Sequence, residues 1–163
     1  MKWGSYIRKK QTKGEFDPGH MFVYRKSEKR IQCRGFYFNP LELPKDYQDA
    51  SSWRKYLFEH KVPGYVKDDI GDLDIMQERP ECFLGILIDI DDSLEEKIEK
   101  DVIEQKIGHY SFNPDKNHCD NCVTWARKKF NKYAPKCEKL KKIREGRIKE
   151  ALRELELWQQ KKL

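Results

Sequence analysis

An alternation of apolar and polar positions near the N-terminus predicts the first well-defined element of the chain. Residues 20–24 are rich in β-prone side chains and directly follow an Asp-Pro-Gly turn signal. In a strand, His20 and Phe22 would share one face of a sheet, and Met21 would lie on the other. A polar turn and a second β-prone run come next. The pattern predicts a β-hairpin over residues 19–38.

Three later segments predict a central strand and two helices. The apolar, β-branched stretch at residues 82–90 is far shorter than the roughly 20 residues of a membrane span and predicts a buried central strand. Helical spacing of apolar side chains over residues 93–107 and 121–134 predicts two amphipathic helices that pack against the sheet. The first of them is expected to begin with Ser93 as N-cap and Glu96 as its capping-box partner.

The segment between the hairpin and the apolar strand is expected to hold one helix and one loop. The helix should begin at Ser51 or Ser52 and end before the Val-Pro-Gly at 62–64. The loop is acidic and carries Asp68, Asp69, Asp72 and Asp74. Because this spacing lacks the terminal Glu of a calcium loop, the stretch is interpreted as a solvated loop.

Together these elements predict one α+β domain over residues 16–134, in which a small antiparallel sheet packs against helices. Residues 1–15 are expected to form a short edge strand or a loose N-terminal arm. Residues 135–163 have the pattern of a long, highly charged amphipathic helix. No internal repeat is visible.

Composition narrows the class of protein. The chain has 163 residues, of which 38% are charged, and its Trp, Tyr and Phe residues are numerous enough to anchor a core. No apolar signal segment follows Met1, so the chain is expected to be cytoplasmic or exported by a non-classical route. Five cysteines form no regular disulfide framework, which favours reduced thiols that are available for chemistry.

The positive charge is concentrated toward the C-terminus. The net charge is +6, but residues 126–149 hold eleven Lys or Arg against two Glu, so the remainder of the chain is slightly acidic. A basic segment on an acidic body suggests one alternative function: a non-catalytic interaction module that binds nucleic acid or an acidic partner.

The main candidate for chemistry is Cys122. It lies at the first turn of the predicted helix, with Asp120 or Asn121 available as N-cap. Unpaired backbone N–H groups and the helix dipole favour a thiolate at that place, and the Cys122 N–H could stabilise an oxyanion. A nucleophilic thiol needs a base, and His20, at the start of a strand, is the best placed on local grounds.

The same region could instead hold a metal or redox site. Cys119 and Cys122 form a C-x-x-C flanked by His109 and His118. A zinc site usually needs a second ligand pair, and the only other nearby thiol is Cys137. A redox motif would need a βαβ context that is only partly present. Cys119 is therefore interpreted as a bystander, or as a thiol that could silence Cys122 through a disulfide.

The order of these features resembles the circularly permuted branch of the papain-like NlpC-type cysteine peptidases and amidases, which includes the lecithin:retinol acyltransferase-like enzymes. In that branch the catalytic His lies on an early strand and the nucleophilic Cys opens a later helix. The matching segments here are Gly19–Val23 and Asn121–Ala126. Gly35–Tyr37 is similar to the hairpin-return motif of a bacterial subgroup that contains toxin and effector domains. The resemblance covers roughly residues 16–134.

The resemblance implies a cysteine hydrolase in which Cys122 is the nucleophile and His20 the general base. A polar residue about a dozen positions after the His usually orients the imidazole, and Gln32 stands at that spacing. The branch more often has His or Glu there. Gln can accept a hydrogen bond from the imidazole but adds no charge, so Asn39 is kept as an alternative. No metal or organic cofactor is implied.

The implied reaction is hydrolysis or transfer of an acyl group through a thioester. The expected substrate is a peptide or other amide, in peptidoglycan or in a protein, and an ester is a weaker alternative. A protein partner that inhibits or delivers the enzyme is expected from the toxin-like subgroup. Under this interpretation nucleic acid is not expected as a partner, and no transmembrane segment is expected.

Overall fold

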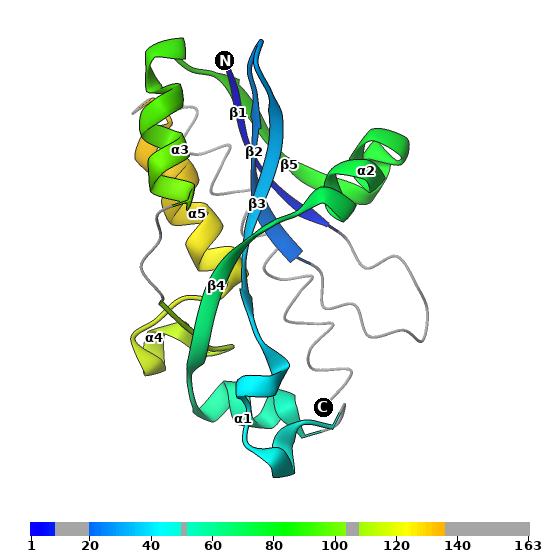
Figure 1. Cartoon of the computed structure of the whole chain (residues 1–163), viewed down its shortest axis with the longest axis vertical. Coiled ribbons are helices and arrows are strands. Elements are labelled where there is room, and N and C mark those ends of the chain that lie inside the picture. Colours follow the sequence, from blue (N-terminus) through cyan, green and yellow to red (C-terminus); the bar gives the residue numbers. More distant parts are fainter. Residues whose placement is uncertain (9–19, 50–51, 104–107, 136–163) are drawn as a thin grey trace.

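The computed structural model describes residues 1–8, 20–49, 52–103 and 108–135 (Figure 1). These residues form a mixed α+β structure with a six-stranded antiparallel sheet in the order β5-β1-β2-β3-β4-β6. The strands are β1 (Lys2–Arg8), β2 (His20–Lys26), β3 (Ile31–Phe38), β4 (Val62–Asp68), β5 (Phe83–Asp89) and β6 (His109–Tyr110). The helices are α1 (Trp53–Glu59), α2 (Ile70–Glu78), α3 (Glu95–Ile103), α4 (Pro114–Asn117) and α5 (Cys122–Tyr133). Short 3-10 turns occupy η1 (Pro40–Glu42), η2 (Lys45–Tyr47), η3 (Pro80–Cys82) and η4 (Asp92–Leu94).

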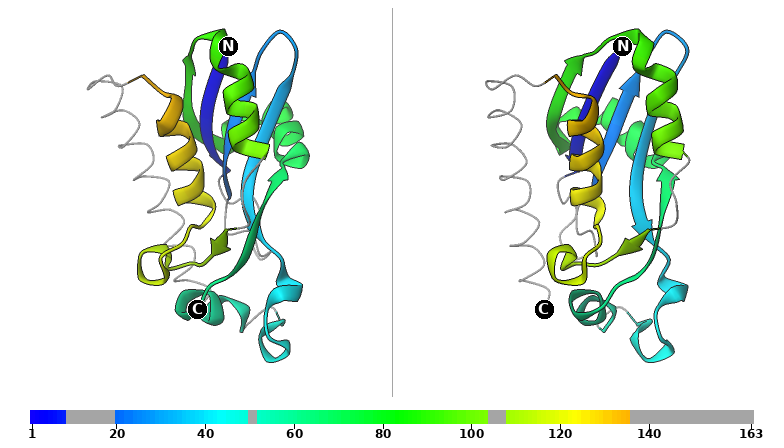
Figure 2. Two further views of the ribbon diagram at one scale, coloured as in Figure 1. Left: turned by 60° about the vertical axis from the view of Figure 1, so that its left-hand side comes forward. Right: turned by 90° about the vertical axis from the view of Figure 1, so that its left-hand side faces the viewer.

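The helices cover the two faces of the sheet unequally. Helices α3 and α5 lie on one face, and α2 lies on the other (Figures 1 and 2). The larger core, between the sheet and α3/α5, contains Met21 and Val23 of the hairpin together with Phe130 of α5. The smaller core lies under α2 and contains Phe22. None of the described helices is long and apolar enough to cross a membrane.

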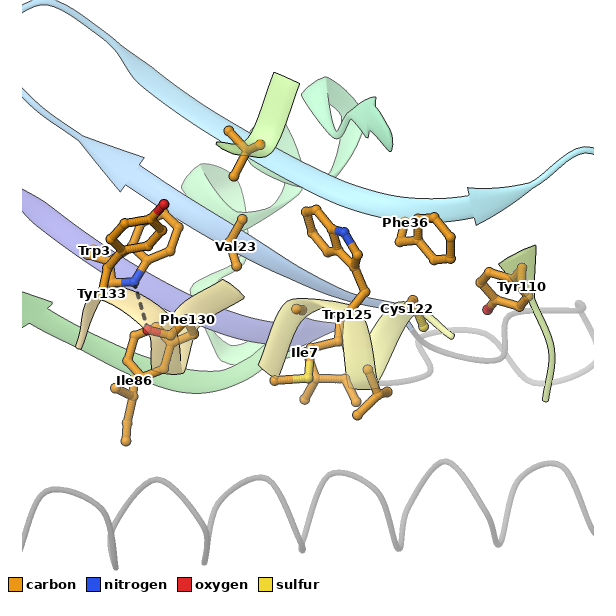
Figure 3. Packing of buried hydrophobic residues seen from close by; sticks show 14 of the residues in the cluster. Trp3, Ile7, Val23, Phe36, Ile86, Tyr110, Cys122, Trp125, Phe130 and Tyr133 are labelled. Atoms are coloured by element: carbon orange, nitrogen blue, oxygen red, sulfur yellow. Dashed lines mark hydrogen bonds between the residues drawn. The ribbon is translucent and has the colours of Figure 1, made fainter. Parts of the chain in front are cut away.

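The predicted hairpin is confirmed, and its alternation decides which side chains reach which core. Phe22 is fully buried with the α2 cluster, whereas Met21 and Val23 are buried under α5. Burying each such side chain contributes roughly 1.5–3 kcal/mol. The predicted helix at 121–134 is also confirmed, as α5, and Trp3 anchors it by donating a hydrogen bond from its indole Nε1 to the Phe130 carbonyl (3.2 Å, Figure 3).

Two strand positions differ from expectation. The edge strand or arm expected at residues 1–15 is wrong for residues 2–8, because β1 is an interior strand between β2 and β5. The central strand expected at residues 82–90 is wrong as well, since β5 pairs with β1 alone among the described strands. An apolar run indicates that both faces of a strand are covered. It does not indicate whether another strand pairs with each of its two edges.

The acidic loop is also a misprediction. Residues 62–68 form β4, which pairs with β3, and residues 70–78 form α2.

The helix expected at 93–107 begins at Glu95. Asp91 rather than Ser93 caps the turn before it, accepting a hydrogen bond from the Ser93 N–H (2.8 Å). Residues 104–107, and the expected C-terminal helix beyond residue 135, lie outside the described residues.

A carboxylate joins the two helices of the larger core. Asp101 of α3 accepts hydrogen bonds from Lys129 Nζ (2.7 Å), Lys132 Nζ (2.7 Å) and the Tyr133 hydroxyl (2.6 Å) of α5. Burial alone would raise the pKa of Asp101, but these three donors hold it well below its usual range. The stability that follows is present above the unfolded pKa of about 4 and is lost as the pH falls through the folded value.

Asp101→Asn should therefore lower the free energy of unfolding by about 1–2 kcal/mol at pH 7. The difference from wild type should shrink as the pH falls below about 4, where Asp101 of the unfolded chain begins to be protonated while the folded carboxylate is still charged. Urea unfolding at a series of pH values measures both effects. Asp115→Asn, at an exposed position of α4, is the control and should change little. A difference that persists unchanged at pH 2 would contradict the electrostatic explanation.

Candidate functional site

The N-terminus of α5 holds Cys122 in a defined position. Asn121 is the N-cap, and its side chain accepts a hydrogen bond from the Thr124 N–H (2.9 Å). The Thr124 hydroxyl oxygen accepts one from the Asn121 N–H (2.9 Å), which completes a capping box. Cys122 follows as the first helical residue and is only 6% exposed. The expected cap at Asn121 is confirmed, and it places the thiol at the positive end of the helix dipole.

The thiol lies where β2 and β3 separate. The pairing of β2 with β3 ends at Phe22 and Gly35, whereas β3 continues to pair with β4 as far as Phe38. His20, the first residue of β2, and the backbone N–H of Met21 lie close enough to Cys122 to lower the pKa of its thiol. Figure 3 shows the thiol at one end of the larger core, between Trp125 and Tyr110. The structure thus brings together Cys122 and His20, the two residues that the sequence singled out.

An aspartate holds the imidazole from its other side. The Nε2 atom of His20 lies 3.1 Å from Oδ2 of Asp69, and both side chains are buried. The Tyr37 hydroxyl donates a hydrogen bond to Oδ1 of the same carboxylate. The Tyr37 ring also stacks on the imidazole, with ring centres 4.4 Å apart. With Nε2 engaged by Asp69, Nδ1 is the ring nitrogen left to meet the thiol.

Asp69 is positioned by the end of β4 and the start of α2. Its N–H donates to the Cys33 carbonyl (3.1 Å), which continues the β3–β4 pairing by one residue. It is the N-cap residue of α2, yet its side chain makes no capping hydrogen bond. An aspartate at this position ordinarily caps the helix. Here the carboxylate is used for His20 and Tyr37 instead.

Gly35 makes this contact sterically feasible. A Cβ atom at Gly35 would lie 2.3 Å from Oδ2 of Asp69 and 2.3 Å from Nε2 of His20. Any side chain here would occupy the space in which the two groups meet. The glycine of the Gly35–Tyr37 motif is therefore required by close approach, and the Tyr of the same motif supplies the hydroxyl to Asp69.

The electrostatics favour a thiolate–imidazolium pair. Burial would lower the pKa of His20, but the hydrogen bonds to Asp69 and Cys122 and the charges of those groups raise it to about 10. Burial would raise the pKa of the Cys122 thiol, but the hydrogen bond and charge of His20 lower it, with help from the Met21 N–H and the Tyr110 hydroxyl. The two opposite shifts stabilise the same state, in which the proton resides on His20.

Tyr110 completes the surroundings of the thiol. Its hydroxyl lies close enough to the side chain and the backbone N–H of Cys122 for both groups to act on its pKa. Burial, followed by the charge of Cys122, raises its pKa well above the usual value, so the hydroxyl keeps its proton. A phenol and a backbone N–H thus stand side by side at the thiol. Both are donors of the kind that stabilises an oxyanion.

Gln32 does not lie at this site. Its side chain accepts a hydrogen bond from Arg25, which also bonds to Glu99. Gln32 is five residues along β3 from Tyr37, or about 16 Å at the rise of a strand. The expectation that Gln32 orients His20 is wrong for this geometric reason. The alternative, Asn39, caps η1 by accepting a hydrogen bond from the Leu41 N–H (3.0 Å).

Cys119, the other cysteine of the C-x-x-C, has the opposite electrostatics to Cys122. Burial and the nearby charge of Asp120 raise the pKa of Cys119, and the four described cysteines are free thiols. His109 and His118 are exposed. Within the described parts of the chain, no group of three or more His, Cys, Asp or Glu side chains is arranged to hold a metal ion.

The basic segment at 126–149 is described only as far as residue 135. In that part, Lys128 pairs with Asp120 (2.7 Å), and Lys129 and Lys132 pair with Asp101. Much of the positive charge on α5 is therefore compensated within the protein. This part of the segment adds no specific support to the interaction-module alternative.

Sequence reasoning missed three residues of the site: Asp69, Tyr37 and Tyr110. Tyr37 was inside a recognised motif, but nothing in the motif indicated its hydrogen bond. Asp69 was one of four similar carboxylates, and only the β3–β4 register shows which of them turns inward. Tyr110 precedes Cys122 by twelve residues, and its role depends on the pairing of β6 with β4.

Comparisons with known proteins do not place the chain in a family. No family model matches it, and no match is found among curated proteins or among solved structures.

Proposed function

We propose that the protein is a cysteine-dependent hydrolase with a permuted papain-like arrangement, acting on a peptide or other amide through a thioester intermediate. The observation that carries the proposal is the buried series Cys122–His20–Asp69, with the thiol at a helix N-terminus. This series contains an activated nucleophile, a base and a charged residue that orients the base. The early His and late Cys also fit the order of the permuted branch, including its toxin and effector members.

The first half of the proposed reaction is acylation of Cys122. The thiolate attacks the carbonyl carbon of the amide and forms a C–S bond, while the carbonyl oxygen takes up negative charge. The Cys122 N–H and the Tyr110 hydroxyl donate to that oxygen. As the C–N bond breaks, the imidazolium of His20 transfers its proton to the leaving nitrogen. The products of this half are a free amine and a thioester.

The second half regenerates the thiol. Neutral His20 takes a proton from a water molecule, whose oxygen attacks the thioester carbonyl. The C–S bond then breaks, a carboxylic acid leaves and the thiolate–imidazolium pair is restored. Asp69 keeps the ring oriented and offsets its charge in both halves.

Alkylation of the thiol tests the proposal directly. Iodoacetamide at pH 6, read by mass spectrometry of peptides, should modify Cys122 at least ten times faster than Cys119, because thiolate reactivity follows the opposite pKa shifts of the two thiols. The Cys122 rate should decline only when the pH falls below its lowered pKa. Hydrolysis, by contrast, should also fail on the alkaline side, as His20 loses its proton near pH 10.

The His20→Ala variant provides the control for this experiment. It removes the group that lowers the pKa of Cys122, so labelling at pH 6 should slow by about a hundredfold or more, while Cys119 labelling stays the same. Equal, slow labelling of Cys119 and Cys122 in the wild-type protein would overturn the proposed function.

A further inference from the structure

The face of the sheet that carries α2 is only partly covered by helices, and we call it the outer face. Helix α2 packs on this face over Phe22 and Cys33. Next to it, the same face carries Tyr37, Tyr65 and Lys67, because Tyr37 pairs with Tyr65 and Gly35 with Lys67 across β3 and β4. Tyr65 is 43% exposed, and Lys67 is exposed.

This surface is continuous with the candidate site. The Tyr37 ring stacks on His20 on one side, and its centre is 6.1 Å from that of Tyr65 on the other. The Lys67 ammonium lies over the Tyr37 ring, 5.4 Å from its centre. The surface therefore begins at the imidazole of the candidate site, where Tyr37 contacts His20, and continues over β3 and β4 to Tyr65 and the Lys67 ammonium. We call Tyr37, Tyr65 and Lys67 the Tyr-Lys surface.

The cation on this surface has no carboxylate partner among the described side chains. The nearby Asp68 pairs with Arg34 (2.9 Å), and both carboxylate oxygens of Asp69 are engaged by His20 and Tyr37. Lys67 thus differs from Lys128, Lys129 and Lys132, which have carboxylate partners within the protein. An exposed tyrosine beside an ammonium that has no carboxylate partner in the described part of the chain suits a ligand with an apolar stem and a negative end.

We propose that Tyr65 and Lys67 form a substrate subsite that selects peptides with a carboxylate side chain close to the scissile amide. Tyr65 packs against the stem of that side chain, and Lys67 pairs with its carboxylate. This inference rests on the proposed function, because it takes Cys122 as the point of reaction. It narrows the substrate class from amides in general to acidic peptides.

Two electrophilic peptides that differ only in charge test the subsite. Chloroacetyl-alanyl-glutamate amide and chloroacetyl-alanyl-glutamine amide both alkylate a thiolate, which forms a C–S bond and releases chloride. With the wild-type protein at low salt, the glutamate probe should modify Cys122 about three to five times faster than the glutamine probe, in keeping with a partly exposed ion pair. Raising the salt concentration should reduce this preference.

Three variants test whether the preference for the glutamate probe depends on Tyr65 and Lys67. Lys67→Gln should bring the two probes to equal rates, and Tyr65→Ala should slow both. Lys26→Gln removes the same charge at the other end of β2, about 20 Å from His20, and should keep the wild-type preference. Equal rates for the two probes with the wild type, or a preference that survives Lys67→Gln, would overturn the subsite alone. Failure of both probes to select Cys122 would overturn the proposed function instead.

Discussion

Asp69→Asn should slow the alkylation of Cys122 at pH 6 by about a hundredfold or more. Asn is close to Asp in size and can still accept a hydrogen bond from the imidazole, so the main change is the loss of a negative charge. That charge and its hydrogen bond raise the pKa of His20. Without them the proton is held less strongly, the thiolate loses its counter-charge, and the pKa of Cys122 returns toward its ordinary value near 9.

The neighbouring aspartate supplies a matched control. Asp68 is one residue away, but it lies on the outside and pairs with Arg34 rather than His20. Asp68→Asn should therefore leave the Cys122 rate close to that of the wild type. The Asp69 side chain does not cap α2, so Asp69→Asn should leave the far-ultraviolet circular dichroism spectrum unchanged. A variant that is folded and reacts at the wild-type rate would show that Asp69 has no part in activating the thiol.

Asp69→Asn should have so large an effect on alkylation because the thiolate–imidazolium pair of Cys122 and His20 is buried. Removing a thiolate and an imidazolium from water costs several kcal/mol for each ion, and their mutual attraction recovers this only when further hydrogen bonds are in place. Asp69 on one side, and the Met21 N–H with the Tyr110 hydroxyl on the other, provide those bonds. Loss of one partner in such a network leaves an uncompensated charge, and the protein avoids it by neutralising the pair.

The second large effect is expected from a single methyl group. Gly35→Ala would place a Cβ atom 2.3 Å from both Oδ2 of Asp69 and Nε2 of His20, well inside van der Waals contact. The two groups must move apart, so their hydrogen bond is lost along with the support for the ion pair. We expect alkylation of Cys122 at pH 6 to fall as far as in Asp69→Asn. Overpacking should also lower the free energy of unfolding by about 1–3 kcal/mol.

Gly71→Ala, in α2, is the control for Gly35→Ala. A Cβ there would meet nothing within 4 Å, and alanine is favoured over glycine in a helix by about 0.5–1 kcal/mol. Gly71→Ala should thus leave the Cys122 rate unchanged and slightly raise the urea midpoint. The Asp69→Asn, Gly35→Ala double variant should react no more slowly than either single variant, because both remove the same contact. Additive losses would indicate that Gly35 acts elsewhere.

Much of the local structure could be predicted from the chain alone. The strand at residues 20–26 and the helix at 122–133 follow from periodicities of about two and 3.6, and Asn121 caps its helix through side-chain chemistry close in sequence. These signals suffice to place Cys122 at a helix N-terminus and His20 at a strand start. They also separate Cys122 from Cys119, which lies just outside the helix.

The partner of His20 could not be predicted in this way. The resemblance implied Gln32, but the turn between β2 and β3 places that residue opposite Arg25, at the far end of the ladder. Asp69 directly follows β4, a third strand that pairs with β3, and lies forty-nine positions after His20. Asp68 and Asp74 in the same stretch are aspartates too, and no pattern within the stretch distinguishes them from Asp69.

The sequence by itself thus determined the thiol, the helix end that favours its ionised form and the strand that carries the imidazole. Only the tertiary structure decided that they meet, that Asp69 supports them and that Gly35 must lack a side chain. The physical reason is the range of the interactions. Caps and periodicities act within a few residues, whereas the contacts of the site depend on the register between strands, and a slip of one residue would turn Asp69 to the opposite face.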